Sequence, residues 1–149
     1  MRIDVAGLMV MLVCATAQAA DLDYGLAPRL IAEDTYLFEG LNEDFSRDNG
    51  GNIVNVAAIV TRAGVVVINT GPSKLYGEQL LAAIGRLTDQ PVIRIFVSKL
   101  HPDHFLGSQA FPEVTRSTLA ETIAGISDQG EQFTLNMYRM VGPWMIGTE

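Results

Sequence analysis

Cysteine and histidine are scarce in this sequence. The 149 residues include a single cysteine, Cys14, and two histidines, His101 and His104. Because Cys14 lies in an apolar N-terminal stretch, the rest of the chain has no disulfide framework and no thiolate for metal binding or nucleophilic catalysis. Any metal ion would therefore have to be held by histidines and carboxylates.

Basic residues are also in the minority. The chain has 10 Lys and Arg against 17 Asp and Glu, which gives a formal net charge of -7. It contains no block of Lys or Arg that could follow a phosphate backbone, so the composition argues against a nucleic-acid partner. Hydrophobic residues make up 48% of the sequence, which is enough for the core of one globular domain.

The N-terminal segment has the form of a secretory signal peptide. An apolar run at 7–13 is closed by the small-residue sequence Ala-Gln-Ala at 17–19. The run is too short to cross a bilayer comfortably. We expect removal of residues 1–20 and a periplasmic or secreted mature protein, residues 21–149, without membrane attachment. The alternatives are a buried N-terminal helix, a membrane anchor, or lipid attachment at Cys14.

The region between residues 35 and 97 alternates between strand and helix patterns. Runs of β-branched, aromatic and apolar residues predict strands at 35–40, 53–60, 65–68 and 92–97, and helical spacing predicts a helix at 74–87. The second and third strands would form a hairpin, and their near-continuous apolarity predicts that both faces are covered. The later strand, helix and strand form a βαβ unit, so we predict an α/β fold with a mixed sheet.

Two helices are predicted after the second strand of this unit. Thr118 and Glu121 have the spacing of a capping box for a helix at about 119–126. A second helix would carry one apolar face, formed by Phe133, Met137, Met140, Val141 and Trp144. Such a stripe usually packs into the core, and a cofactor or quinone pocket is the alternative.

The chemistry-bearing residues are concentrated directly after the strand at 92–97. His101, Asp103 and His104 offer two imidazoles and a carboxylate within four residues. These are the groups that bind zinc when thiolates are absent, and the carboxyl end of such a strand is where α/β sheets place their ligands. The alternative is a chance loop in which Asp103 serves as a turn or helix-capping residue.

Two motifs resemble the metallo-β-lactamase superfamily, whose hallmark is His-x-His-x-Asp-His after a strand, preceded by a strand that ends in Asp-Thr-Gly. The matching segments here are Lys99–His104 and Asn69–Gly71. Within the superfamily, residues 33–149 resemble the quinoprotein relay system zinc metallohydrolases, also through Gly50–Ile53 and the ending Trp144–Glu149. The resemblance implies the N-terminal half of an αββα sandwich, with helices flanking a mixed sheet.

The resemblance also implies a role for each residue of the site. His101 would serve the first of one or two zinc ions, and Asp103 and His104 would serve the second, with Asp103 supporting catalysis as a ligand. Proteins of this kind hydrolyse their substrates with water that the metal activates, and here the small-molecule substrate is unknown.

Three departures bear on that implied activity. Lys99 stands where the first histidine belongs, and its ammonium group has no lone pair for zinc. Asn69 replaces an aspartate and loses its charge, and no histidine follows His104 in the sequence. The competing hypotheses are a truncated zinc hydrolase and a non-catalytic remnant or binding module. Either would expose an apolar sheet face, and we expect self-association or a missing C-terminal half to cover it.

Overall fold

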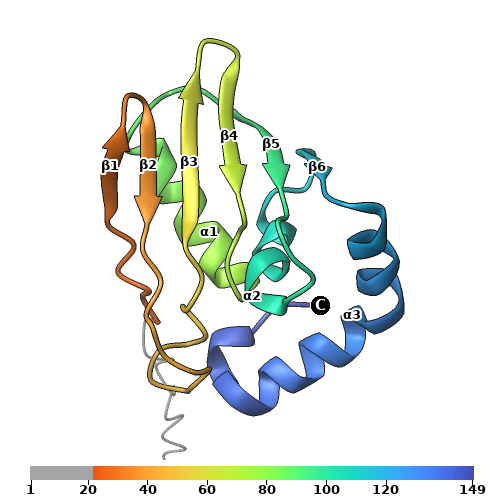
Figure 1. Ribbon diagram of the computed structural model, residues 1–149. Coiled ribbons are helices and arrows are strands. Elements are labelled where there is room, and N and C mark those ends of the chain that lie inside the picture. The colour runs from red at the N-terminus through yellow and green to blue at the C-terminus, as the bar shows by residue number, and fades with distance from the viewer. Residues whose placement is uncertain (1–21) are drawn as a thin grey trace, which may run out of the picture.

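One mixed sheet of six strands dominates the computed structural model, which describes residues 22–149 (Figure 1). The predicted signal peptide and Cys14 lie outside the described residues. Strands β1 to β4 are antiparallel neighbours, and β5 and β6 add in parallel. In their order across the sheet, the strands are β1 (Pro28–Ala32), β2 (Thr35–Phe38), β3 (Val56–Thr61), β4 (Gly64–Ile68), β5 (Val92–Phe96) and β6 (Thr115–Ser117).

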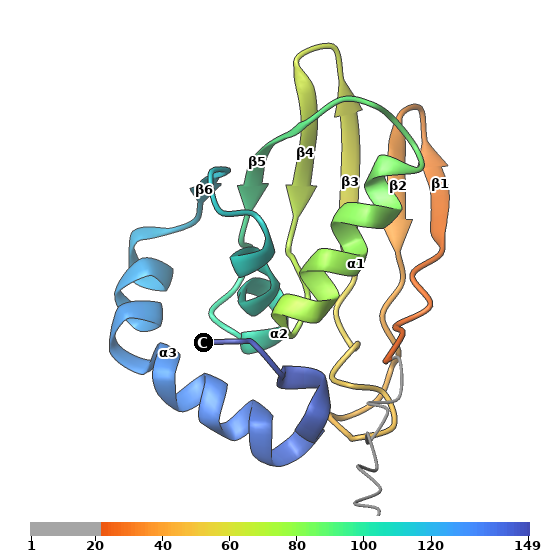
Figure 2. The same ribbon diagram turned by 180° about the vertical axis from the view of Figure 1, so that it is seen from behind.

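Helices lie behind the sheet and beside its lower end. The chain forms α1 (Lys74–Gly85), α2 (Pro102–Phe105), the 3-10 helix η1 (Leu106–Ala110), α3 (Ala120–Val141) and the 3-10 helix η2 (Gly142–Met145). Figure 2 shows α1 lying across one face of the sheet, with α3 running along the side of the molecule. Between residues 22 and 149, no helix is both long enough and apolar enough to span a bilayer.

The predicted hairpin and βαβ unit are confirmed. Strands β3 and β4 pair in antiparallel register through a tight turn, and β4 pairs with β5 in parallel after α1. Ser73 caps α1, because its side-chain oxygen accepts a hydrogen bond from the Tyr76 backbone N–H. The α/β class and the mixed sheet with flanking helices therefore follow the sequence prediction.

The hydrophobic core lies between the sheet and α1. Alternate strand residues point into it, and the buried members from β3, β4, β5 and α1 are Val56, Ala58, Val65, Val67, Ile95, Tyr76, Leu80, Ala83 and Ile84. Period-two alternation places their neighbours on the opposite face. Burial of these side chains fixes the sheet against α1 and sets the position of the strand ends.

The opposite face of the sheet is only partly covered, which corrects the prediction that both faces would be buried. Among the described residues no helix crosses this face, which Figure 1 shows toward the viewer. We call it the open face, and its apolar members are Leu37, Ala57, Ile59, Val66, Ile68 and Phe96. Phe96 is 41% exposed and the other five are half-buried. The apolar runs in the sequence therefore include side chains on a sheet face that residues 22–149 leave partly exposed.

The C-terminal helices differ from the prediction. A single helix, α3, spans Ala120–Val141 where two were expected. The capping box does not form, because the Thr118 hydroxyl donates to the Val97 carbonyl and no side chain caps the helix at Leu119. In the predicted apolar stripe, Met137 and Val141 are fully buried and Met140 is 39% exposed. Core packing thus accounts for the centre of the stripe.

Candidate metal centre

The three candidate ligands lie at the carboxyl end of β5. The strand ends at Phe96, and α2 begins at Pro102 with His101 as its N-cap residue. His101 makes no side-chain capping bond, and Asp103 sits inside the helix, so the capping role considered for Asp103 is wrong. This edge of the sheet is where open α/β folds place their ligands.

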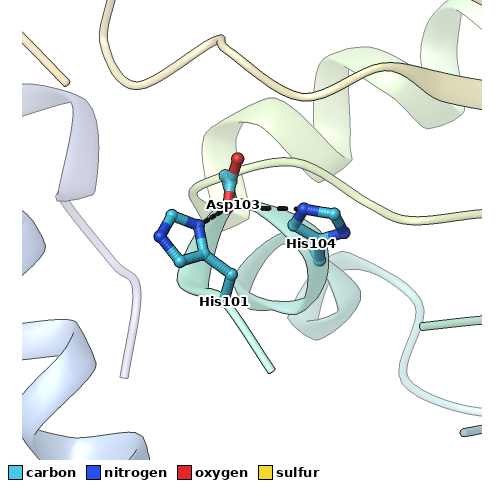
Figure 3. Close-up of side chains that lie close together, drawn as sticks. All are labelled: His101, Asp103 and His104. Atoms are coloured by element: carbon cyan, nitrogen blue, oxygen red, sulfur yellow. Dashed lines mark hydrogen bonds and ion pairs between the residues drawn. The ribbon is translucent and has the colours of Figure 1, made fainter. Parts of the chain in front are cut away.

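The tight first turn of α2 brings the three side chains together. One candidate ligand atom from each of His101, Asp103 and His104 lies within 4.8 Å of the others. His101 Nδ1 forms a hydrogen bond with Asp103 Oδ1, and His104 Nε2 lies 3.9 Å from the same oxygen (Figure 3). The Asp103 carboxylate is therefore the common neighbour of both imidazoles.

The site is buried at its centre and more open at its rim. The Asp103 side chain is 4% exposed, while His104 and His101 are 17% and 40% exposed. Burial lowers the pKa of His104, and the negative charge of Asp103 opposes this effect only in part. His104 is therefore neutral at physiological pH, which is the form in which an imidazole binds a metal.

Imidazole and carboxylate groups are suitable ligands for zinc. Of the possible pairs of ligands, Asp103 and His104 come nearest to the distance that one zinc ion requires. Ligand atoms around one tetrahedral zinc lie roughly 3.3 Å apart, since zinc bonds to nitrogen and oxygen are about 2.0–2.2 Å long. The His104 Nε2 to Asp103 Oδ1 distance of 3.9 Å needs only a small adjustment. His101 and Asp103 lie too close together to share one ion unless their hydrogen bond opens.

Lys99 lies beside this group. The residue is exposed, and its backbone carbonyl accepts a hydrogen bond of 3.0 Å from the His101 N–H. Its ammonium charge contributes to the lowered pKa of His104. A positive charge therefore lies close to the candidate ligands.

Asn69 and Ser98 form a second layer of contacts behind His104. Asn69 Oδ1 accepts hydrogen bonds from the Ser98 N–H at 3.1 Å and from the Ser98 hydroxyl at 2.9 Å. The same hydroxyl lies 3.0 Å from His104 Nδ1. Asn69 belongs to the Asn69–Gly71 motif that the sequence already marked. Ser98 was not predicted to be part of the site. The only sequence signal for it was its position directly before the motif at Lys99–His104.

A loop between β2 and β3 forms one wall of the site and was not predicted to be part of it. Phe45, an aromatic residue in an otherwise polar segment, stacks on His101 with ring centroids 5.4 Å apart. Asn49 organises the loop, because its side chain accepts from Gly51 N–H at 2.8 Å and donates to the Asp44 carbonyl at 2.8 Å. These hydrogen bonds hold the loop in place beside His101.

Comparisons with known proteins agree with this arrangement. A family model described as metallo-beta-lactamase superfamily matches residues 49–121, which include the three candidate ligands, Asn69 and Ser98 but not Phe45. No curated protein matches the chain. The solved structures that resemble it include TMB-1 and the metallo-beta-lactamases from Pontibacter korlensis and Erythrobacter litoralis.

These structural similarities are at the level of the fold. TMB-1 is 21% identical, with a TM-score of 0.57 over 71% of this chain and 48% of its own. The Pontibacter korlensis structure is 21% identical, with a TM-score of 0.56 over 70% and 48%. The Erythrobacter litoralis structure is 16% identical, with a TM-score of 0.57 over 73% and 48%.

The chain thus spans about half the length of the solved structures that it matches. His101, Asp103 and His104 lie within the residues that the family model matches. The family model and the fold therefore point to the same group of proteins: residues 49–121 match the metallo-beta-lactamase superfamily model, and the chain shares the fold of solved metallo-beta-lactamases.

Proposed function

We propose that this chain supplies the first group of zinc ligands of a metallo-beta-lactamase-type hydrolase. The observation that carries the proposal is the convergence of one ligand atom each from His101, Asp103 and His104 within 4.8 Å at the carboxyl end of β5. Asp103 and His104 would be the principal ligands, and His101 would join them once its hydrogen bond to Asp103 opens. Zinc is the cofactor that this donor set favours.

Each residue of the site has a distinct part in this proposal. The buried Asp103 carboxylate supplies the negative charge for a cation, and neutral His104 supplies a lone pair. Zinc, when bound, would polarise a substrate carbonyl and lower the pKa of water. With Lys99 in place of the first histidine, the proposed site holds one ion at the Asp103 and His104 position.

The narrower family and the location are also part of the proposal. The motifs support membership in the quinoprotein relay system zinc metallohydrolases, and the segment at 1–20 supports export to the periplasm. Expression of the full chain in a bacterial host, followed by fractionation and N-terminal sequencing, tests the location. A mature protein that begins near residue 21 in the periplasmic fraction is expected, and an uncleaved cytoplasmic chain would contradict it.

Zinc titration tests the metal site. The wild-type chain is expected to bind one zinc ion in competition with a chromophoric chelator, and His104→Ala and Asp103→Asn are each expected to weaken binding by at least about tenfold. Asp128→Asn, which removes an exposed carboxylate on α3, is the control and should bind as the wild type does. Equal binding by all four proteins would overturn the proposal.

A second candidate, a non-catalytic binding module, is favoured by Lys99 and by the hydrogen bond that occupies His101 and Asp103. The two candidates differ in turnover. Zinc-loaded protein should hydrolyse at least one member of a panel of thioesters, lactones, β-lactams and phosphodiesters if it is a hydrolase. Zinc binding without hydrolysis of any of these compounds would favour the binding module.

A further inference from the structure

We infer that Asn69 and Ser98 are positioning residues that hold the His104 imidazole with its proton on Nδ1 and the lone pair of Nε2 directed toward Asp103. The inference deepens the proposed metal site and rests on it for its functional meaning. The arrangement of protons is a property of the metal-free protein, so it can be tested separately. The argument starts from the orientation of the Asn69 amide.

The two ends of the Asn69 amide are fixed by main-chain groups whose roles cannot be exchanged. A backbone N–H can only donate, so the amide atom 3.1 Å from the Ser98 N–H must be the oxygen. A carbonyl can only accept, and the other amide atom donates to the Asn55 carbonyl at 3.3 Å. Both contacts require the same orientation, in which Oδ1 faces Ser98.

The single hydroxyl proton of Ser98 then decides the state of His104. Ser98 Oγ lies 2.9 Å from Asn69 Oδ1, and a hydrogen must lie between these two oxygens. Only Ser98 can supply it, so its hydroxyl donates to Asn69. The same Oγ lies 3.0 Å from His104 Nδ1 and can only accept there, which requires Nδ1 to carry the proton.

Thr70 holds the backbone of His104. The Thr70 N–H donates to the His104 carbonyl at 3.0 Å, and the Thr70 hydroxyl donates to it at 3.3 Å. Asn69 has a φ of 63°, a left-handed conformation that asparagine adopts more readily than most residues. This turn lets Asn69 bond to Ser98, whose hydroxyl contacts the imidazole, while the next residue, Thr70, bonds to the backbone carbonyl of His104.

His101 is held differently. Its Nδ1 is bound to Asp103, whereas the Nε2 of His104 faces the same carboxylate from 3.9 Å without a hydrogen bond. In a metal site, the second ring nitrogen of a ligand histidine usually donates to a neighbouring group, and this bond selects the ligating nitrogen. The neutral pair Asn69 and Ser98 performs that role for His104.

Nitrogen-15 NMR of the metal-free, full-length protein at pH about 8 tests the inference. Long-range proton–nitrogen correlations distinguish the two tautomers, and with two histidines in the chain, a His101→Gln variant assigns the His104 signals. Wild-type protein, Ser98→Thr and Asn69→Asp are expected to show protonated Nδ1, because each keeps the hydroxyl and the acceptor. Ser98→Ala and Asn69→Gly are expected to show a mixture of tautomers.

Ser117→Ala is the matched control, because it removes a hydroxyl that bonds to Arg94 on the neighbouring strand and not to His104. Protonated Nε2 in the wild type, an unchanged pattern in Ser98→Ala, or an equal change in Ser117→Ala would overturn the inference. Ser98→Ala should also weaken zinc binding by about 10-fold or more. Protonated Nδ1 in a wild type that binds no zinc would refute the proposed function and leave the positioning role intact.

Discussion

Phe45 and His101 lie in stacked contact, with their ring planes inclined by 15° and their centroids 5.4 Å apart. This contact joins the loop between β2 and β3 to the candidate metal centre. His101 is the most exposed of the three candidate ligands, at 40%. An aromatic ring therefore packs against this partly exposed imidazole.

Replacement of Phe45 by alanine should weaken zinc binding by about three- to tenfold, because an aromatic pair contributes roughly 0.5–1.5 kcal/mol beyond buried area. Loss of the contact lets His101 occupy more orientations that do not bind. Phe45→Tyr keeps the ring and is the control. A titration in which Phe45→Ala and Phe45→Tyr bind zinc equally well would show that the stacking has no effect on the site.

The same loop is anchored at its other end by Trp144. The indole Nε1–H donates to the Arg47 carbonyl at 2.8 Å, and the indole ring packs against Gly50. The Tyr24 hydroxyl donates to the Gly50 carbonyl at 3.0 Å. The position of Phe45 over His101 thus depends on contacts with segments from both ends of the described chain.

Gly50→Ala is expected to lower the free energy of unfolding by about 2–4 kcal/mol, through backbone strain and overpacking together. Gly50 has a φ of 58°, and an added Cβ would lie 2.4 Å from the Trp144 ring. Gly25→Ala is a matched control with a φ of 60° and no atom within 4 Å of its added Cβ. Urea denaturation should show the smaller loss for Gly25→Ala, and equal losses would contradict the proposed packing role of Trp144.

The predictable parts of the fold are those in which local pattern and tertiary packing agree. The hairpin and the βαβ unit combine apolar runs with turn residues, and Ser73 caps α1 at the point where the predicted helix begins. Strand β1 was missed because its side chains are mostly exposed, and β6 because its three residues, Thr-Arg-Ser, carry no apolar pattern. Both strands lie at the edges of the sheet, and they form because their backbones pair with the neighbouring strand.

The candidate ligands could be predicted from the sequence, but the residues that contact and orient them could not. His101, Asp103 and His104 are close in sequence, so one helical turn is enough to bring them together. Ser98 and Phe45 act through contacts that only the folded chain creates. The single helix α3 was misread as two for the same reason, since the apparent capping residue Thr118 bonds to β5's continuation at Val97.

The open face predicts self-association. Leu37, Ala57, Ile68 and Phe96 form a continuous row across four strands, and apolar surface of this kind is stabilised by burial. Phe96→Asp should shift the chain toward monomer in sedimentation velocity runs at micromolar concentrations. Ile146→Asp, at a residue 68% exposed outside the sheet, is the control. An equal shift in both variants would place the contact elsewhere.

Lys99 offers a direct test of how the site tolerates its cation. Replacement by histidine removes a positive charge near His104 and adds an imidazole, so zinc binding should strengthen by about tenfold or more. Lys99→Gln removes only the charge and should give a smaller gain. If Lys99→His and Lys99→Gln bind zinc equally tightly, the added imidazole does not reach the ion, and only the repulsion by Lys99 limits affinity. If neither variant exceeds the wild type in chelator competition, Lys99 does not oppose metal binding at Asp103 and His104.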